Sequence, residues 1–170
     1  MKLGLCVVGV LLALSPALAV EKGAAAGAGR TLSMTVQAKA SIADVAGHEL
    51  SQIVGVDHIT TPDAISGVSF DGASFQTNIQ ADMVDGAGQV RGYGVWEAKG
   101  GEKLFLIYGY VVPPQPPGKN GFVPFEGTFE WIGGTGRLKD VRGKGTIEGE
   151  VTRSGEARYR WAGTFQQESK

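Results

Sequence analysis

Between Phe122 and Phe165, aromatic and β-branched residues alternate with polar ones between glycine-rich breaks. This feature limits the possible folds most, because a period of two is typical of strands with one buried face and one wetter face. The segments 125–132, 143–151 and 157–165 have this pattern, and glycine turns separate them. They predict an antiparallel β-meander.

The same alternation occurs earlier in the chain. It is clearest at 75–83, where the apolar residues and Thr77 fall on one face, and it continues at 89–98 with Trp96 on the face of two glycines. Segment 31–38 alternates through Leu32, Met34 and Val36, and 103–112 is apolar on both faces. The count is seven or eight strands with short connections. Closing such a sheet removes its edges, which predicts an all-β, antiparallel up-and-down barrel of about eight strands.

The start of the chain has the pattern of an export signal. Lys2 precedes an apolar stretch, and Ala17, Leu18 and Ala19 form a small-residue cleavage site, so residues 1–19 are predicted to be a signal peptide. The apolar run is too short to be a membrane-spanning helix. We therefore expect a periplasmic or secreted protein without stable membrane insertion.

Two further segments have weak patterns. Residues 20–30 are mainly Ala and Gly, which predicts a flexible leader before a single barrel domain at 31–170. Residues 41–50 are compatible with a short helix that Ser41 caps, with Asp44 in its first turn.

Composition excludes several classes of partner and stabilising feature. The formal net charge is −1, so a clustered positive surface for nucleic acid is not expected. The single cysteine, Cys6, lies inside the predicted signal, so the mature chain would have no disulfide. The apolar segment 103–112 needs a cover on its outer face, which makes a homo-oligomer one expectation.

The run from Gly127 to Leu138, followed by Val141 to Gly145, contains the motif Gly-Gly-Thr-Gly-Arg-Leu. It resembles the glycine-rich pattern of bacterial proteins with an allene oxide cyclase-like barrel, an architecture shared with plant allene oxide cyclases and dirigent proteins. The resemblance implies a small calycin-like barrel, often oligomeric, whose lumen can hold an apolar molecule. Leu138 stands where an aromatic residue is more usual.

Candidate functional residues come from the aromatic strands. Rings that share a face either form the core or line a cavity for a small hydrophobic ligand; they are Trp96, Tyr108, Phe129, Trp131, Tyr159 and Trp161. If chemistry occurs there, Arg91, Tyr93 and Glu97 are the candidate catalytic groups, because alternation places all three on one face. This hypothesis requires that face to point inward; if the Trp96 face is the inner one, the hypothesis fails.

The sequence contains no nucleophile triad, nucleotide-binding motif or convincing metal set, although Asp44 and His48 have metal-ligand spacing on a helix. No cofactor is expected. Three functions stay open: a barrel that binds a small hydrophobic molecule in its lumen, a cofactor-free cyclase or isomerase with dirigent-like stereocontrol in the same cavity, and a structural envelope protein with a packed lumen.

Overall fold

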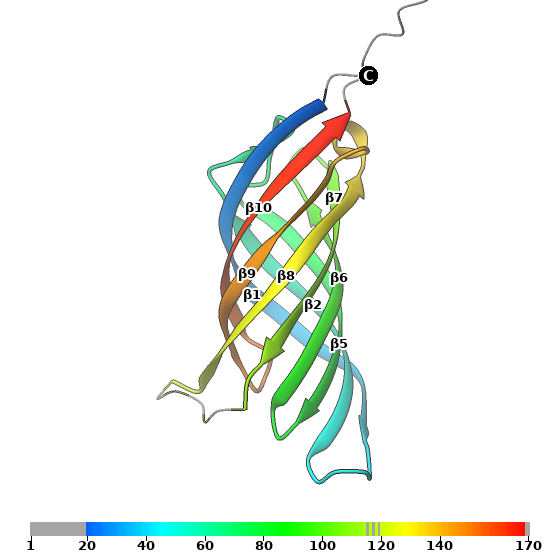
Figure 1. The fold of residues 1–170 in the computed structure, drawn as a ribbon, viewed down its shortest axis with the longest axis vertical. Coiled ribbons are helices and arrows are strands. Elements are labelled where there is room, and N and C mark those ends of the chain that lie inside the picture. Colours follow the sequence, from blue (N-terminus) through cyan, green and yellow to red (C-terminus); the bar gives the residue numbers. More distant parts are fainter. Residues whose placement is uncertain (1–19, 115, 117, 119, 169–170) are drawn as a thin grey trace, which may run out of the picture.

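The computed structural model describes residues 20–114, 116, 118 and 120–168. The predicted signal peptide lies outside the described residues. Eight antiparallel strands close into a barrel in the order β1-β10-β9-β8-β7-β6-β5-β2, and Figure 1 shows them wound steeply around the long axis. Except for the small hairpin between β2 and β5, each strand of the barrel follows its neighbour along the chain. The predicted all-β, up-and-down barrel of about eight strands is therefore confirmed.

The strands of the barrel are long, and the small β3–β4 hairpin forms a separate sheet. The elements are β1 (Val20–Ser41), β2 (His48–Thr60), β3 (Ala64–Ile65), β4 (Val68–Ser69), β5 (Ala73–Val84), β6 (Ala87–Glu97), β7 (Lys103–Val112), β8 (Phe122–Gly134), the 3₁₀ turn η1 (Gly136–Leu138), β9 (Arg142–Thr152) and β10 (Ala157–Glu168).

The prediction of a flexible leader at 20–30 is wrong, because these residues form the first half of β1 and pair with β10 from Val20↔Glu168 to Arg30↔Arg158. The small residues have a packing role that composition alone does not reveal. Gly27 lies opposite Trp161, and a Cβ at Gly27 would come within 2.6 Å of the indole ring. The rings of β10 fill the space that the small side chains leave along β1, so residues 20–30 belong to the barrel.

Glycines accommodate aromatic rings elsewhere in the lumen as well. A Cβ at Gly143 would lie 2.7 Å from the ring of Trp131, its partner across β8 and β9. A Cβ at Gly163 would lie 2.9 Å from the ring of Phe129. Large rings therefore lie flat over a neighbouring strand without a clash, which explains how a chain with 27 glycines fills a narrow barrel.

The short helix expected at 41–50 is also wrong. Ser41 ends β1, His48 begins β2, and a turn with Gly47 at φ +77° joins them. The expected apolar face of Leu32, Met34 and Val36 is not buried as a unit, and register shifts follow Thr31 and Val36. Leu32 and Val36 are exposed, whereas Met34 packs against the core.

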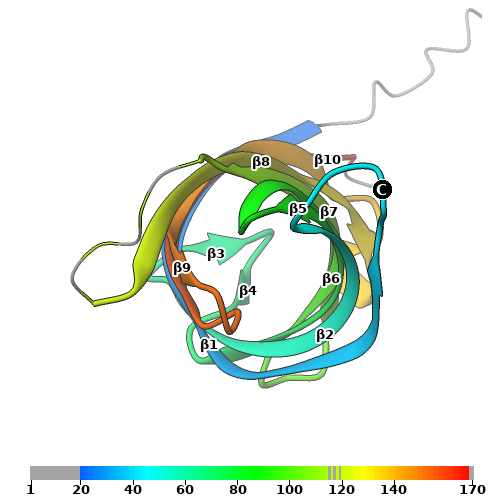
Figure 2. The same cartoon turned by 90° about the horizontal axis from the view of Figure 1, so that it is seen from below.

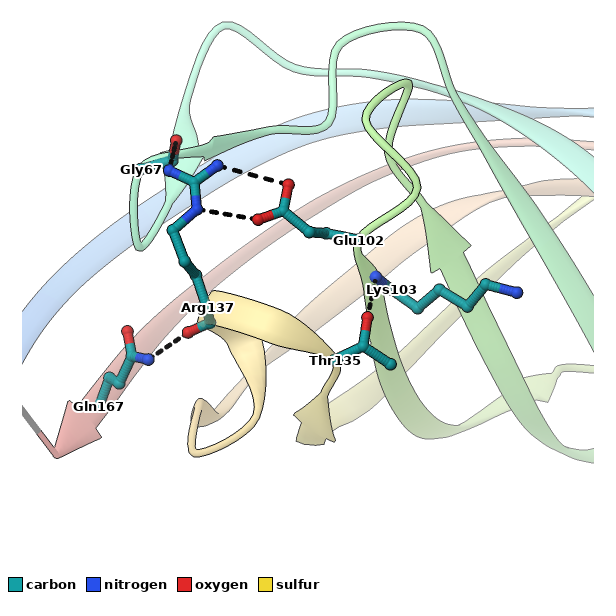
Figure 3. Close-up of polar contacts among 6 residues, drawn as sticks. All are labelled: Gly67, Glu102, Lys103, Thr135, Arg137 and Gln167. Carbon is teal, nitrogen blue, oxygen red and sulfur yellow. Dashed lines mark hydrogen bonds and ion pairs between the residues drawn. The ribbon is translucent and has the colours of Figure 1, made fainter. Parts of the chain in front are cut away.

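The β3–β4 hairpin closes one end of the barrel. Figure 2 shows it across the far end of the ring, and its residues Ile65 and Val68 and the following Phe70 are buried. Arg137 of η1 holds the hairpin in place: its guanidinium donates to the carbonyl of Gly67 at 3.1 Å and to both carboxylate oxygens of Glu102 at 2.8 and 3.3 Å (Figure 3). The glycine-rich motif thus has a structural role, since it places Arg137 beside the hairpin.

The same motif ties neighbouring strand ends together. The Thr135 hydroxyl accepts a 2.9 Å hydrogen bond from the backbone N–H of Lys103, and the Gln167 side chain donates to the carbonyl of Arg137 (Figure 3). Leu138 is fully buried beneath the turn. An aliphatic side chain therefore fills this position completely.

Inward-facing rings divide the lumen into two regions. We call the region beneath the β3–β4 hairpin the tryptophan end; it comprises Phe70, Trp96, Trp131, Trp161 and Phe165. We call the other region the tyrosine end; it comprises Asp57, Tyr108, Tyr110, Phe125 and Tyr159. Among the described residues, no helix has the length and apolarity to cross a membrane.

Candidate functional site

A small cavity of about 40 Å³ lies at the tyrosine end of the lumen. Strands β2, β7 and β10 supply Asp57, Tyr108, Tyr110 and Tyr159 to its wall, because alternation directs every second side chain inward. Trp96 and Trp161 also line it, so the cavity borders the tryptophan end. Met34 of β1 and Gly155 of the β9–β10 turn complete the wall.

Asp57 is the most unusual residue in this wall. It is only 6% exposed and is the one charged residue among the buried residues of the described chain. One carboxylate oxygen, Oδ2, accepts a 2.8 Å hydrogen bond from the Tyr159 hydroxyl. The other, Oδ1, is buried without a hydrogen-bond partner among the described residues. A buried acceptor of this kind is costly, because its hydration is lost and nothing replaces it.

The surroundings of Asp57 make ionisation of its carboxyl group less favourable than in an exposed position. Burial raises the pKa of the Asp57 carboxyl group, and the hydrogen bond from Tyr159 and the nearby Thr31 hydroxyl oppose this effect only in part. Burial and the negative charge of Asp57 raise the pKa of Tyr159 well above its ordinary value. The phenol therefore stays protonated and acts as a hydrogen-bond donor.

The other two tyrosines of the cavity wall, Tyr108 and Tyr110, also stay in the neutral form. The hydroxyl groups of Tyr108 and Thr77 are hydrogen-bonded at 2.6 Å. The Tyr108 and Tyr110 rings are nearly parallel, with centroids 6.3 Å apart, and Tyr110 packs against Phe125 at 4.3 Å. Burial raises the pKa of both phenols. The site thus combines one carboxyl group with aromatic faces and protonated hydroxyls.

All six predicted ligand-binding residues face the lumen. Five of them line the cavity, namely Trp96, Tyr108, Phe129, Tyr159 and Trp161. Trp131 does not: it is 1% exposed and packs among Trp96, Phe129 and Trp161. Their contact with a ligand stays a prediction.

The candidate catalytic set of Arg91, Tyr93 and Glu97 does not enter the lumen. On β6 the inward face carries Val90 and Trp96, which are 5% and 3% exposed, so the alternate residues point outward. Tyr93 is 45% exposed, and Glu97 forms a 3.3 Å ion pair with Lys103 on the outer surface. The condition that these groups face inward is not met, and the catalytic hypothesis for them is withdrawn.

Sequence reasoning missed Asp57, although a signal was present. In the segment 55–59, Gly55, Asp57 and Ile59 share one face, and that face is buried. Acidic residues in an alternating strand usually lie on the solvent side, so the sequence pattern alone did not mark Asp57 as a lumen residue. The signal was the position of an acidic residue on the same strand face as the apolar Ile59.

The spacing of Asp44 and His48 suggested a metal site, but the helix that it required is absent. His48 lies between two carboxylates, with Nδ1 2.7 Å from Asp44 and Nε2 2.8 Å from Asp82. These two hydrogen bonds raise the pKa of His48. Within the described part of the chain, no group of three or more His, Cys, Asp or Glu residues is arranged to hold a metal ion.

Comparison with known proteins assigns no function to this site. No model of a protein family matches the chain, and no curated protein is significantly similar to it.

Proposed function

We propose that this protein is an exported barrel that binds a small molecule at the tyrosine end of its lumen. The observation that carries the proposal is the cavity beside Asp57, whose wall combines aromatic rings with a carboxyl oxygen, Oδ1, that has no hydrogen-bond partner among the described residues. Unpaired polar atoms are rare in protein interiors, and those in a concave, largely apolar site favour ligand binding. The indole N–H groups of Trp96 and Trp161, which also line the cavity, are unpaired as well.

The size of the cavity limits the ligand. Typical pockets for drug-sized ligands enclose roughly 300–1,000 Å³, whereas this cavity encloses about 40 Å³. A ligand of a few non-hydrogen atoms fits without rearrangement. A larger one requires displacement of Met34, whose unbranched side chain adapts easily to new surroundings.

Identification of a bound compound tests the proposal directly. Native mass spectrometry of protein purified from its own host, followed by denaturing extraction, should reveal a small molecule in stoichiometric amount. Titration with short neutral alcohols, followed by tyrosine ring NMR, gives an independent test. A protein that carries nothing and binds none of the probes contradicts the proposal.

A pair of variants tests the location. Ala157 lines the cavity, whereas Ala162 lies on the same strand and points outward. The Ala157→Leu variant should fill the cavity and abolish binding, whereas Ala162→Leu should bind as the wild type does. Equal binding by the two variants would place the ligand elsewhere.

Two alternatives have observations in their favour. The mutual contacts of Trp96, Trp131 and Trp161 favour a structural protein with a packed lumen. The raised pKa of Asp57 and its bond to Tyr159 favour a cofactor-free isomerase, in which a carboxyl group would exchange a proton with a bound substrate.

Export, membership of the allene oxide cyclase-like family and homo-oligomer formation stay proposals. For the oligomer, the exposed pair Tyr93 and Ile107 on the outer face of β6 and β7 is the surface to test.

A further inference from the structure

We propose that the tyrosine end binds a small primary ammonium ion, with the ammonium group on the Asp57 carboxylate and the carbon atoms against the tyrosine rings. This inference rests on the proposed function and names the chemical class of its ligand. It follows from the charge, the aromatic walls and the size of the cavity.

The charge in the lumen has no counterpart in the described part of the chain. Asp57 is the one charged residue among the buried residues there, and no Lys or Arg forms an ion pair with it. Buried carboxylates are normally paired with a cation, because an isolated charge loses its hydration. Oδ2 is occupied by the Tyr159 hydroxyl, whereas Oδ1 is free to accept. An ammonium group offers both the donor and the opposite charge.

The walls around Asp57 suit a cation. The face of an aromatic ring carries partial negative charge, so aromatic rings attract organic cations, most strongly where water is excluded. Tyr108, Tyr110 and Tyr159 surround the same cavity as the carboxylate, and Phe75 and Phe125 add two further rings. The phenol hydroxyls remain protonated and neutral, so the negative charge of the site comes from Asp57 and not from the tyrosines.

Anions and purely apolar molecules fit this site less well. A carboxylate or phosphate ligand would meet the negative charge of Asp57, and like charges at close range in a dry site repel strongly. A hydrocarbon would leave Oδ1 unpaired. A neutral alcohol is able to donate one hydrogen bond, and it is therefore the relevant competitor.

Cavity size defines the probes. A buried water molecule requires roughly 10–15 Å³ of such space, so a cavity of about 40 Å³ accepts approximately three non-hydrogen atoms. Ethylammonium and ethanol have three non-hydrogen atoms each and acetate has four, and the three probes differ in charge. For a ligand this small, the dissociation constant is expected to be on the order of 1 mM.

The experiment is a titration of the mature protein with ethylammonium, ethanol and acetate at constant ionic strength, followed by amide and tyrosine ring NMR. Ethylammonium should bind at least about tenfold more tightly than ethanol, and acetate should not bind. This comparison uses wild-type protein, so it does not depend on whether a variant folds.

Two variants assign the charge preference to Asp57. Asp57→Asn keeps the size of the side chain and removes the charge, so it should lose the preference for ethylammonium over ethanol. Asp71→Asn is the matched control, because Asp71 is exposed in the loop between β4 and β5; it should retain the preference.

The outcomes separate this inference from the proposed function. Binding of ethanol without a preference for ethylammonium would overturn the inference and leave the proposed function supported. Binding of ethylammonium that Asp57→Asn does not weaken would also overturn it, since the cation would then bind elsewhere. Absence of binding by all three probes would contradict both.

Discussion

At the tryptophan end, indole and phenyl rings meet one another at steep angles, with Trp96 and Trp131 5.9 Å apart at 74° and Phe70 and Trp96 5.6 Å apart at 60°. At the tyrosine end, rings of similar size surround a carboxyl group and a small cavity. Both regions belong to one lumen and use the same contact between glycine and aromatic residue. At the tryptophan end the rings contact one another, whereas at the tyrosine end they also border a carboxyl group and the cavity.

The two regions also differ in how the barrel closes over them. The β3–β4 hairpin covers the tryptophan end, and Arg137 fastens it from outside (Figure 3). At the tyrosine end, the Thr31 hydroxyl of β1 accepts a hydrogen bond from the backbone N–H of Ala157, and no second layer of sheet among the described residues covers this end. We therefore expect stability to depend mainly on the tryptophan end and binding on the tyrosine end.

Truncation of a ring should have the largest effect, and the effect should differ between the two ends. Trp131→Ala removes a ring that is 1% exposed, and it should lower the free energy of unfolding by about 3–5 kcal/mol. Tyr110→Ala removes a half-buried ring beside the cavity and should lower the free energy of unfolding by less, on the order of 2 kcal/mol. Urea unfolding measures both. Equal losses would mean that the two ends are equally packed.

A methyl group at Gly27 should disturb the tryptophan end from the opposite strand. In Gly27→Ala the new Cβ would overlap the Trp161 ring and the Thr60 carbonyl, and such overpacking typically costs about 1–3 kcal/mol. Gly100→Ala is the control, since a Cβ there would meet only the flexible end of Glu102 at 3.4 Å. Thermal unfolding of both variants checks the prediction. A stable Gly27→Ala protein would contradict the packing described for β1.

Removal of the charge at the tyrosine end should stabilise the protein in a pH-dependent way. Because burial raises the pKa of Asp57, the folded state holds its proton more tightly than the unfolded chain. The stability that this provides is fully present below the unfolded pKa, roughly 3.9, and is lost as pH rises through the raised value. The side chain in Asp57→Asn does not titrate. The free energy of unfolding of this variant should therefore exceed that of the wild type by an amount that grows with pH, to about 1 kcal/mol.

The measurement for this prediction is urea unfolding between about pH 4 and pH 8, without added amines. Asp71→Asn changes an exposed residue, and the difference in stability between this variant and the wild type should not grow with pH in this way. A difference between Asp57→Asn and the wild type that does not change with pH would show that Asp57 has an ordinary pKa.

The smallest effect is expected outside the lumen. The Arg137 side chain is 60% exposed, so water screens the ion pair with Glu102 and its contribution to global stability should be small. Arg137→Ala should instead accelerate amide hydrogen exchange in the β3–β4 hairpin, because the bond to the Gly67 carbonyl is lost. Arg30→Ala, a change of an exposed residue on β1, should leave the hairpin unaffected. If hydrogen exchange in the hairpin is unchanged in Arg137→Ala, Arg137 does not hold the hairpin in place.

The fold was predictable where alternation is strict. Segment 75–83 was assigned correctly, because Phe75 and Ile79 face a dry lumen and the residues between them face water. Residues 20–30 were not, because a strand of Ala and Gly has no side-chain pattern of its own. The small residues of this strand fit the rings of β10, such as Trp161, and this fit is recognised only when the pairing of the two strands is known.

The candidate site was predictable only in part. Alternation showed that Arg91 and Tyr93 share a face opposite to Trp96, but it did not show which face points inward. Packing decides that question, since a large indole ring is stabilised by burial more than an arginine is. Asp57 was missed for the complementary reason: it lies in an inward position that a charged residue normally avoids.

The most direct test of a divided lumen is NMR of protein labelled with ¹³C in its tyrosine and tryptophan rings, titrated with ethylammonium. The chain contains four tyrosines and three tryptophans, and outward-facing Tyr93 provides an internal control. We predict that the ring signals of Tyr108, Tyr110 and Tyr159 shift together, while those of Tyr93 and Trp131 do not move. Shifts at Trp131 as large as those of the lumen tyrosines, or shifts confined to Tyr93, would contradict the account.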